Sequence, residues 1–229
     1  MTQKLAIVGY GKMGKLIEHL APEYGFAVQA RIDVGGDLEA ARGADVAVEF
    51  TEPTAVVNNV ETLAALGVST VVGTTGWLNQ MDRVRAAVER HGRGLVWSPN
   101  FSIGVNVFFR LVREAARLLE AEPQYGAWAW EIHHATKKDA QSGTLLKLIQ
   151  EMKGAGYSHP VNASSNRAGA HPGTHEVGFD SAADTITLRH SARSREGFAR
   201  GALKAAQWLP GKRGIFQFEE ILFQTDPAK

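Results

Sequence analysis

The sequence predicts an α/β protein in which a doubly wound parallel sheet is joined to a second, α+β domain with an open mixed sheet. Residues 1–100 alternate short apolar runs with amphipathic stretches, and a glycine-rich turn follows the first run. After Phe101 the pattern changes to a long helical stretch followed by segments with period-two alternation. Apolar strands that alternate with helices indicate a parallel sheet covered on both faces, whereas period-two alternation is typical of a sheet with one open face.

The N-terminal region contains five expected strands separated by helices. The strands are short apolar runs, at 5–9, 26–33, 45–51, 68–76 and 94–100. The helices have apolar residues at three-to-four spacing, at 12–23, 52–67 and 79–92. Gly67 and Gly92 stand where the second and third helices should end. Ligands of such a sheet bind at the carboxyl ends of its strands.

The C-terminal region has a less regular pattern. A helix is expected at 105–120, a strand at 126–134 and a short helix at 143–153. A loop rich in Gly, Ser, Asn and Pro then leads to two strands, 175–180 and 184–192, joined by a turn at 181–183. A last helix is expected at 195–211, and the segment 214–223 is too short and apolar to stand alone.

Composition excludes several classes of function. The chain has 229 residues, 44% of them hydrophobic, and a formal net charge of +1, so it can bury a sizeable core and has no excess of basic residues for nucleic acid. It has no cysteine, which excludes disulfides, thiolate metal sites and thiol nucleophiles. No apolar run approaches a membrane span, and the N-terminus runs straight into a strand pattern. We therefore expect a cytoplasmic protein whose partners are small molecules or copies of itself.

A glycine-rich turn, "GYGKMG", follows the first strand and opens the first helix. Gly9, Gly11 and Gly14 have the G-x-G-x-x-G spacing that lets a pyrophosphate approach the amides of a helix N-terminus. This motif predicts a Rossmann-type dinucleotide site, although such turns also occur simply as connections between a strand and a helix.

Asp33 ends the second strand, where an acidic side chain would accept hydrogen bonds from the adenosine ribose hydroxyls. Its carboxylate would repel a 2′-phosphate and therefore favours NADH over NADPH, although Arg31 or Lys12 could still tolerate the phosphate. The alternative is that Asp33 only begins a loop. Two further segments, Gly73–Gly76 and Ser98–Asn106, follow the fourth and fifth strands, so they lie at the same edge as candidates for the nicotinamide side of the site.

The segment "EIHHATKKDAQSGT", Glu131–Thr144, contains the most candidate catalytic and binding residues. The strand period places His133 and His134 on opposite faces, so only one of them need face a cavity. Lys137 could protonate an imine-type nitrogen or pair with a carboxylate. Ser142, Gly143 and Thr144 begin a helix and offer an anion site. The alternative is a polar loop with structural histidines.

A second glycine-rich segment, "RAGAHPGTHEVGF", contains Arg167 and His175 and lies either near the same pocket or in a connection without a ligand role. We expect no metal, because adjacent strand histidines point apart and lack the spacing of a zinc helix. A nucleotide-binding redox sensor would need the glycine turn but would have no use for the histidines and lysine, and it is the principal alternative to an enzyme.

Taken together, these motifs resemble the 4-hydroxy-tetrahydrodipicolinate reductase family, also called dihydrodipicolinate reductases. The resemblance covers essentially the whole chain, through the segments "VGYGKMG", "VEFTEP", "VVGTTG", "SPNFSIGVN", "EIHHATKKDAQSGT", "RAGAHPGTHEVGF" and "SREGFARGALKAAQWLPGKRGIF". It implies reduction of a cyclic imine dicarboxylate to tetrahydrodipicolinate in lysine and diaminopimelate biosynthesis, with NADH or NADPH as the reductant. It also implies a homotetramer assembled through the second sheet.

The resemblance also implies roles for individual residues. His133 would be the proton donor or acceptor, and Lys137 a proton donor that also contacts a substrate carboxylate. His134, Ser142, Gly143 and Thr144 would bind the substrate. The residues expected to bind the cofactor are Gly9, Tyr10, Gly11, Lys12, Met13, Asp33, Gly73, Thr74, Thr75, Ser98, Pro99, Asn100 and Phe101.

The expected domains are a dinucleotide-binding domain at 1–102 and 203–229, and a substrate-binding and oligomerisation domain at 103–202. One position departs from the family pattern, because Gln141 stands where proline is usual. Its replacement could loosen the turn before the anion-binding helix or bring the glutamine amide into the site. Ala135 and Thr136 also replace more basic residues.

Overall fold

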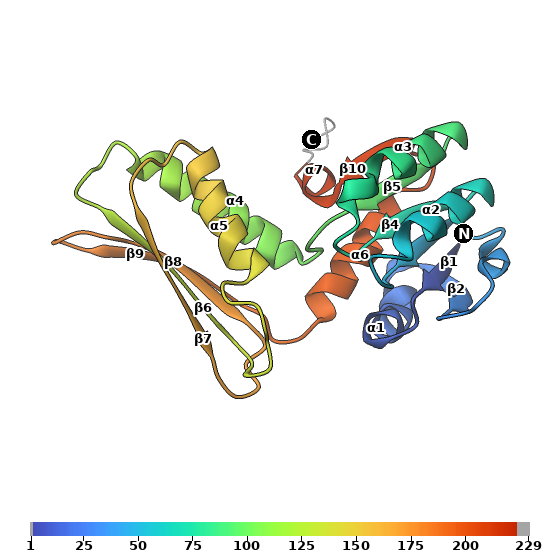
Figure 1. Cartoon of the computed structure of the whole chain (residues 1–229), viewed down its shortest axis with the longest axis horizontal. Coiled ribbons are helices and arrows are strands. Elements are labelled where there is room, and N and C mark those ends of the chain that lie inside the picture. Colours follow the sequence, from blue (N-terminus) through green and yellow to red (C-terminus); the bar gives the residue numbers. More distant parts are fainter. Residues whose placement is uncertain (1, 224–229) are drawn as a thin grey trace. The chain divides into compact units, whose positions relative to one another are not determined.

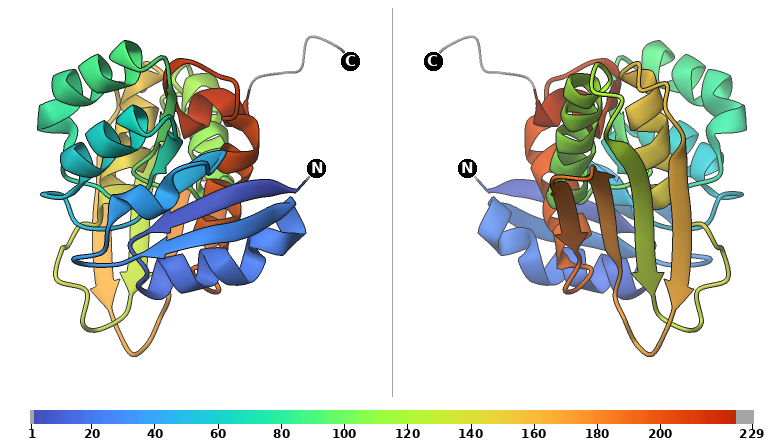
Figure 2. Two further views of the ribbon diagram at one scale, coloured as in Figure 1. Left: turned by 90° about the vertical axis from the view of Figure 1, so that its right-hand side faces the viewer. Right: turned by 90° about the vertical axis from the view of Figure 1, so that its left-hand side faces the viewer.

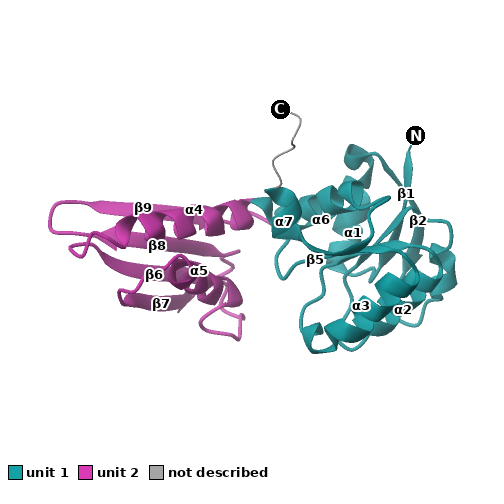
Figure 3. Cartoon of the chain, turned by 90° about the horizontal axis from the view of Figure 1, so that it is seen from above, with its two compact units in different colours: residues 1–103, 196–229 teal, residues 104–195 magenta. Residues whose placement is uncertain are grey.

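The computed structural model describes residues 2–223 and divides into two compact units. Unit 1 comprises Met1–Ile103 and Glu196–Lys229, and unit 2 comprises Gly104–Arg195 (Figure 3). Each unit has its own sheet, of six strands in unit 1 and four in unit 2. Within the described residues, no helix is long and apolar enough to cross a membrane.

Unit 1 is built on a parallel sheet with the strand order β10-β5-β4-β3-β1-β2. Its strands are β1 (Gln3–Val8), β2 (Phe26–Ile32), β3 (Val46–Glu49), β4 (Ser69–Val72), β5 (Gly94–Trp97) and β10 (Gly214–Gln217). Its α-helices are α1 (Lys12–Leu20), α2 (Val56–Ala65), α3 (Met81–Arg90), α6 (Glu196–Trp208) and α7 (Phe218–Leu222), and its 3-10 helices are η1 (Ala21–Tyr24), η2 (Leu38–Ala41) and η3 (Leu78–Gln80). The predicted doubly wound sheet is confirmed, and the left view of Figure 2 shows β1 and β2 side by side near α1.

Alternate residues of the central strands enter different cores, which is why these strands are mostly apolar, whereas edge strand β2 carries exposed polar residues. Leu5 and Ile7 of β1 pack with α1 and α6, whereas Ala6 and Val8 pack on the α2 side. Val72 of β4 and Leu95 of β5 join the side covered by α2 and α3. Figure 1 shows these helices on the two sides of the sheet. A sheet buried on both faces leaves its carboxyl edge as the place for polar groups.

The apolar composition of the C-terminal segment is explained by its place in the sheet and core of unit 1. Residues 214–217 form β10, which pairs in parallel with β5 from Gly214 beside Gly94 to Gln217 beside Trp97. Phe218, which begins α7, is 1% exposed and packs on Phe101 with ring centroids 5.0 Å apart. This segment could not stand alone because it completes the sheet and core of unit 1.

Unit 2 has a mixed sheet of order β7-β6-β8-β9, with helices on one face (Figure 1). The strands are β6 (Gly126–His133), β7 (Val161–Arg167), β8 (Thr174–Asp180) and β9 (Thr185–Ser191), and the helices are α4 (Ile103–Leu119) and α5 (Gly143–Gly154). β6 pairs in parallel with β7 and antiparallel with β8, which in turn pairs antiparallel with β9. The right view of Figure 2 shows the strands in front of α5. The predicted open mixed sheet is confirmed.

Strand β7 is a correction to the sequence-based prediction, which placed a loop there. Its sequence, "VNASSNR", has few β-branched or aromatic residues, so composition disguised it. The strand lies at the edge of the sheet, where one side chain in two is exposed and polar residues are tolerated.

The second boundary between the units also differs from the expected 202/203 and falls between Arg195 and Glu196. The reason is that α6 packs as a whole on unit 1, with Ala199, Ala202 and Leu203 fully buried in its core. Gly201 lies so close to the loop after β5 that an added Cβ would be 1.7 Å from the Phe101 carbonyl oxygen. A glycine at this point lets the helix and that loop approach each other.

Candidate active site

The glycine turn of unit 1 has three glycines with three different environments. An added Cβ on Gly9, whose φ is +92°, would lie 2.1 Å from the Phe50 carbonyl oxygen, and one on Gly14 would lie 2.3 Å from the Gly9 carbonyl oxygen. At Gly11 it would meet nothing within 4 Å. Gly9 and Gly14 therefore serve the tight turn and the packing of α1, whereas Gly11 leaves open space for a ligand.

The N-terminus of α1 has the features of a phosphate site. Gly11 is its N-cap, no side chain caps the helix, and its first turn contains no acidic residue. The first backbone amides are consequently available to an anion, and the helix dipole favours negative charge there. The turn thus fits the pyrophosphate of a dinucleotide.

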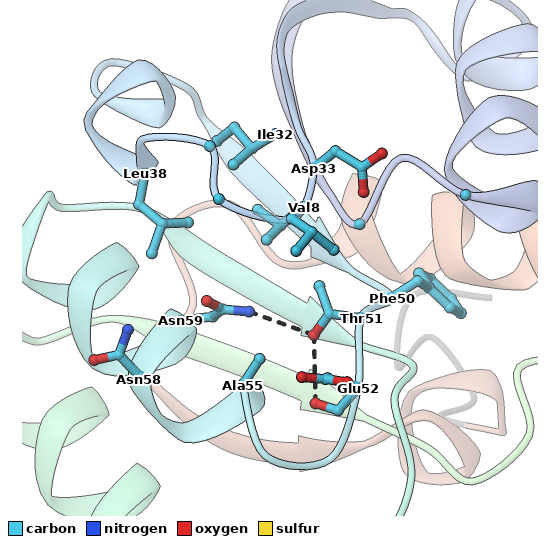
Figure 4. Close-up of a pocket in the computed structure, with 15 residues that line it drawn as sticks. Val8, Ile32, Asp33, Leu38, Phe50, Thr51, Glu52, Ala55, Asn58 and Asn59 are labelled. Atoms are coloured by element: carbon cyan, nitrogen blue, oxygen red, sulfur yellow. Dashed lines mark hydrogen bonds between the residues drawn. The ribbon is translucent and has the colours of Figure 1, made fainter.

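A cavity of about 480 Å³ adjoins this turn at the carboxyl edge of the sheet (Figure 4). Of the predicted cofactor residues, Gly9, Gly11 and Asp33 line it. The lining that the sequence-based prediction missed comes from the segment after β3 and from α2: Phe50, Thr51, Glu52, Ala55, Asn58 and Asn59. The sequence signals for these residues were their position after a buried strand and, for Phe50, Thr51 and Glu52, the segment "VEFTEP" of the family resemblance.

Asp33 follows β2, and its carboxylate is exposed beside the glycine turn (Figure 4). Arg31, a candidate partner for a 2′-phosphate, is instead paired with Glu18: its Nε lies 2.6 Å from Glu18 Oε1, and its Nη2 bonds the same atom. The Tyr10 hydroxyl also donates a hydrogen bond to Glu18 Oε2. These hydrogen bonds lower the pKa of Glu18, and the one from Arg31 has the largest effect. Arg31 therefore already has an anionic partner within the protein.

The other predicted cofactor residues do not line this cavity. Phe101 is 2% exposed and belongs to the core, and Ser98 is buried, with its Oγ bonded to the backbone of Asn100. Gly73 lies under the Phe50 ring, where an added Cβ would come 2.1 Å from Cε1. The remaining members of this group are Tyr10, Lys12, Met13, Thr74, Thr75, Pro99 and Asn100.

Glu49, at the end of β3, is a buried carboxylate that the sequence-based prediction did not assign. It is 0% exposed and accepts hydrogen bonds from Thr51, from Thr74 Oγ1 at 2.7 Å and from Asn59 Nδ2 at 3.2 Å. Burial raises its pKa despite these hydrogen bonds. Thr74 also accepts from the Thr51 amide at 2.8 Å. Glu49 thereby ties the loop after β4 to the segment that lines the cavity.

In unit 2, the sheet register gathers the polar residues of three strands. Glu131 of β6 stands directly opposite His175 of β8 and beside Ser165 of β7. His133, two residues further along β6, shares the face of Glu131. This is the face covered by helices, because Ala127 and Ala129 of the same strand lie in the helix-packed core. The register therefore directs a carboxylate and two histidines towards the N-terminal end of α5.

Glu131 is the centre of this cluster and is 0% exposed. Its Oε1 accepts from the Ser142 amide and from Arg167 Nη2, both at 2.9 Å, and from Ser165 Oγ at 3.0 Å, while Ser142 Oγ donates to Oε2. Burial alone would raise the pKa of Glu131, but the hydrogen bonds from Ser142 and Arg167 outweigh it and lower the pKa to about 2. Glu131 is thus a carboxylate throughout the physiological pH range.

His133 lies at the end of β6 with 12% of its side chain exposed. Its Nε2 is 3.4 Å from Glu131 Oε2 and 3.3 Å from His175 Nε2. Burial is the main cause that lowers its pKa, with Lys137 and Arg167 acting in the same direction and Glu131 opposing them. A histidine with a lowered pKa next to a fixed carboxylate is suited to proton transfer near neutral pH.

The residues that follow His133 form a turn. β6 ends at His133, so His134 lies outside the strand and its Nδ1 is 2.8 Å from Thr136 Oγ1. Lys137 Nζ is 2.7 Å from Asp139 Oδ1, and Arg167 Nη2 donates to the Asp139 carbonyl. Lys137 is therefore held near Arg167 by one exposed aspartate, which gives this end of unit 2 two cations.

Ser142 differs from the other two residues expected to bind an anion. It is 3% exposed, caps α5 by accepting from the Leu145 amide, and gives both of its own donors to Glu131. Gly143 is exposed, and an added Cβ would meet nothing within 4 Å. Gly143 and Thr144 are therefore the accessible residues at the start of α5. Gln141, which precedes them, is partly buried and joined to Ala140 by a cis peptide bond.

The cluster also brings together three groups with metal-ligating atoms, in Glu131, His133 and His175, all within 4.8 Å of one another. The second histidine of this cluster comes from β8 and not from position 134, so the divergence of the adjacent histidines does not by itself exclude a metal. The Arg167 guanidinium at 2.9 Å from Glu131 already balances its charge, and a dication there would face that guanidinium. The hydrogen bonds favour a proton network over a metal centre.

Family models match both units of the chain. The model described as "Dihydrodipicolinate reductase, N-terminus" matches residues 3–101, and the model described as "Dihydrodipicolinate reductase, C-terminus" matches residues 104–222. The chain belongs to the dihydrodipicolinate reductase family. The family resemblance predicted from the sequence is confirmed, and with it the expected oxidoreductase activity.

Curated relatives in this family carry the name 4-hydroxy-tetrahydrodipicolinate reductase. The protein from Christiangramia forsetii is 34% identical over 237 residues, which cover 95% of this chain and 97% of the relative. A protein from Anaeromyxobacter dehalogenans is 37% identical over 200 residues, which cover 79% and 73%. Among solved structures, a dipicolinate-bound dihydrodipicolinate reductase from Paenisporosarcina sp. TG-14 has a TM-score of 0.77 at 22% identity, covering 96% of this chain and 100% of that one.

Proposed function

We propose that this chain is a 4-hydroxy-tetrahydrodipicolinate reductase that uses NADH to reduce a cyclic imine dicarboxylate to tetrahydrodipicolinate. This reaction belongs to lysine and diaminopimelate biosynthesis and would take place in the cytoplasm. The observation that carries the proposal is the buried Glu131 cluster, which holds His133 beside Lys137 in the unit matched by the family's C-terminal model. A nucleotide-binding sensor would have no need of such a proton-transfer group.

Unit 2 would bind and protonate the substrate. A dianionic substrate needs cationic and amide donors, which Lys137, His134 and the start of α5 at Gly143 and Thr144 supply. The bound nicotinamide would supply the hydride, and its addition leaves an electron-rich enamine that must take up a proton. We assign that proton transfer to His133, with Lys137 as a second donor. Ser142 would act indirectly, because its amide and hydroxyl already hold Glu131.

Unit 1 would bind the dinucleotide, with the pyrophosphate at Gly11 and the adenosine ribose at Asp33. NADH is favoured over NADPH for two reasons: the Asp33 carboxylate repels a 2′-phosphate, and Arg31 is already paired with Glu18. Lys12 to Met13, Gly73 to Thr75 and Ser98 to Phe101 would contribute mainly through backbone groups, since several of their side chains are engaged in the core or in the Glu49 network.

Replacement of Asp33 by alanine should weaken NADH binding by about 1–2 kcal/mol, the worth of hydrogen bonds to a charged group, and leave NADPH binding less affected or improved. Fluorescence titration of both cofactors with the wild type and the variant measures this. The matched control is Asp37→Ala, because Asp37 is a nearby acid that only caps the 3-10 helix η2. An equal loss for the two cofactors would exclude a role of Asp33 in reading the ribose.

A homotetramer through the second sheet is supported by the face of that sheet that carries no helices. Trp128 lies against Gly178, where an added Cβ would come 2.2 Å from its ring, and Trp130 donates to Asn166 at 2.8 Å. A depression of about 360 Å³ on this face is lined by both tryptophans. Flat, aromatic and polar surfaces of this kind are typical of protein interfaces. Light scattering should give four times the chain mass of 24.8 kDa, and a monomer in solution would contradict the proposal.

A single-turnover experiment tests the proposed reaction. The protein loaded with NADH is mixed with freshly prepared 4-hydroxy-tetrahydrodipicolinate, and the near-ultraviolet absorbance of reduced nicotinamide is followed. We expect a substrate-dependent loss of that absorbance and formation of tetrahydrodipicolinate, identified by mass spectrometry. An unchanged absorbance would favour a catalytically silent nucleotide sensor on the same scaffold.

A further inference from the structure

His175 has no role in the function proposed above, yet it contacts the proton-transfer cluster directly. It lies in β8 and is 5% exposed, so its ring nitrogens depend on protein partners. Its Nε2 is 3.3 Å from Glu131 Oε2, 3.2 Å from Ser142 Oγ and 3.3 Å from His133 Nε2. One buried imidazole nitrogen therefore faces a carboxylate, a hydroxyl and a second imidazole.

The contact between the two imidazoles constrains their protons. Two ring nitrogens 3.3 Å apart form a hydrogen bond only when one carries a proton and the other does not. Burial, followed by the nearby His133, lowers the pKa of His175 to about 4, so His175 is neutral at neutral pH. Glu131 is ionised and can only accept. The Nε2 atoms of His133 and His175 both face this obligatory acceptor, at 3.4 and 3.3 Å, so one of the two imidazoles donates a proton there and the other accepts from it.

We propose that His175 is a positioning residue: together with Glu131 it holds His133 in the tautomer that carries its proton on Nε2, so that Nδ1 is the atom that exchanges a proton with the substrate. The role of Nδ1 rests on the proposed reductase function, whereas the tautomer does not. In this arrangement His175 carries its own proton on Nδ1 and accepts at Nε2. Glu131 Oε2, 3.4 Å from His133 Nε2, shares the same proton.

The residue before β8 must be small to leave room for the His133 ring. Gly173, which precedes β8, has a φ of +132°, and an added Cβ would lie 2.9 Å from His133 Cε1 and 3.0 Å from Nδ1. The ring centroids of His133 and His175 are 5.0 Å apart at an interplanar angle of 70°. His133 is therefore held at its Nε2 edge by His175, while the missing side chain of Gly173 leaves space beside Nδ1.

The proton balance follows from this geometry. At rest His133 is neutral with its proton on Nε2; it takes up a second proton from solvent at Nδ1 and enters the step as an imidazolium. The enamine carbon forms a bond to the Nδ1 proton, the N–H bond breaks with its electron pair left on Nδ1, and solvent later returns a proton to that nitrogen. The Nε2 proton stays between Glu131 and His175 throughout. Without these partners the two neutral tautomers would compete, and the protonated nitrogen would not be defined.

Several charged groups face the cluster. Glu131 and Asp139 favour the imidazolium form of His133, whereas Lys137 and Arg167 disfavour it. The remaining titratable neighbour is His190, which stands opposite His175 on β9 and has its own pKa lowered by burial. His190 stacks on Phe108 with ring centroids 6.0 Å apart. It is a matched control, because it neighbours His175 on the same face.

Two replacements of His175 separate positioning from packing. Glutamine keeps an oxygen that can accept from His133 Nε2, whereas leucine keeps only volume. NMR of the full-length protein with ¹⁵N-labelled histidine, recorded without substrate, identifies which nitrogen of His133 is protonated. We expect Nε2–H in the wild type and His175→Gln, and a mixture of tautomers in His175→Leu. His190→Leu should match the wild type.

The effects of the variants on kcat should follow the same order as their effects on the His133 tautomer. We expect kcat of His175→Leu to fall about tenfold or more, with substrate KM and NADH affinity within about twofold of wild type, and His175→Gln to recover most of the loss. Three results would overturn the inference: His133 protonated on Nδ1 in the wild type, an unchanged tautomer in His175→Leu, or stoichiometric Zn²⁺ binding that His175→Leu abolishes. A protein without reductase activity that still shows the expected tautomers would reject the proposed function and uphold the positioning role.

Discussion

Replacing His133 by glutamine should lower kcat by about 10²–10⁴-fold, the usual contribution of a general acid or base, while NADH affinity stays nearly unchanged. The loss is expected because glutamine can occupy the site between Glu131 and His175 but cannot release a proton to an enamine. Steady-state kinetics together with a fluorescence titration of NADH measure the two quantities separately.

The matched control for this change is His159→Gln, since His159 belongs to the same unit but contacts Glu120. It should leave both quantities unchanged. A large loss of NADH binding in His133→Gln would count against a role confined to proton transfer. Retention of wild-type kcat would remove His133 from the mechanism altogether.

Replacing Glu131 by leucine should destabilise the protein by about 3–5 kcal/mol, because it leaves the Arg167 guanidinium without its buried partner. Arg167 has 16% of its side chain exposed and its Nε, also buried, makes no hydrogen bond, so little solvent can compensate. Ser142 and Ser165 would also lose an acceptor. Equilibrium unfolding in urea measures the free energy of unfolding.

Glu114→Leu is the control for loss of a glutamate that is paired with arginine at the surface. Both side chains of that pair are more than half exposed, at 55% and 58%, so its removal should leave the free energy of unfolding close to that of the wild type. An equal effect of the two changes would show that the Glu131 cluster does not stabilise unit 2.

The same carboxylate sets a pH dependence. Because folding lowers the pKa of Glu131 from 4.5 to about 2, its contribution to stability is fully present above about pH 4.5 and is lost as the pH falls towards about 2. The wild type should therefore lose stability in that range more steeply than Glu131→Leu, in which this term is absent. Parallel curves for the two proteins would contradict the assignment.

Much of the fold could be predicted because the patterns were local and strong. The central strands of unit 1 are apolar on both sides, and the glycine turn specifies the first strand-to-helix connection. Edge strand β7 could not be predicted, because "VNASSNR" reads as a loop until β6 is known to lie beside it. The place of α6 in unit 1 depended on its packing, which single-sequence patterns do not reveal.

The candidate site was predicted in part for the same reason. The segment Glu131–Thr144 is contiguous, so its histidines, lysine and helix start could be seen together in the sequence. The period of two already placed Glu131 on the face of His133, and this signal could have identified the carboxylate. His175 and Arg167 come from other strands, and only the sheet register brings them to Glu131.

The central claim is tested most directly by initial rates of NADH and NADPH oxidation on freshly prepared 4-hydroxy-tetrahydrodipicolinate. We predict oxidation that depends strictly on the dicarboxylate, with a higher kcat/KM for NADH than for NADPH. Absence of oxidation with either cofactor, by a folded protein that binds NADH, would contradict the assignment of this chain as a reductase.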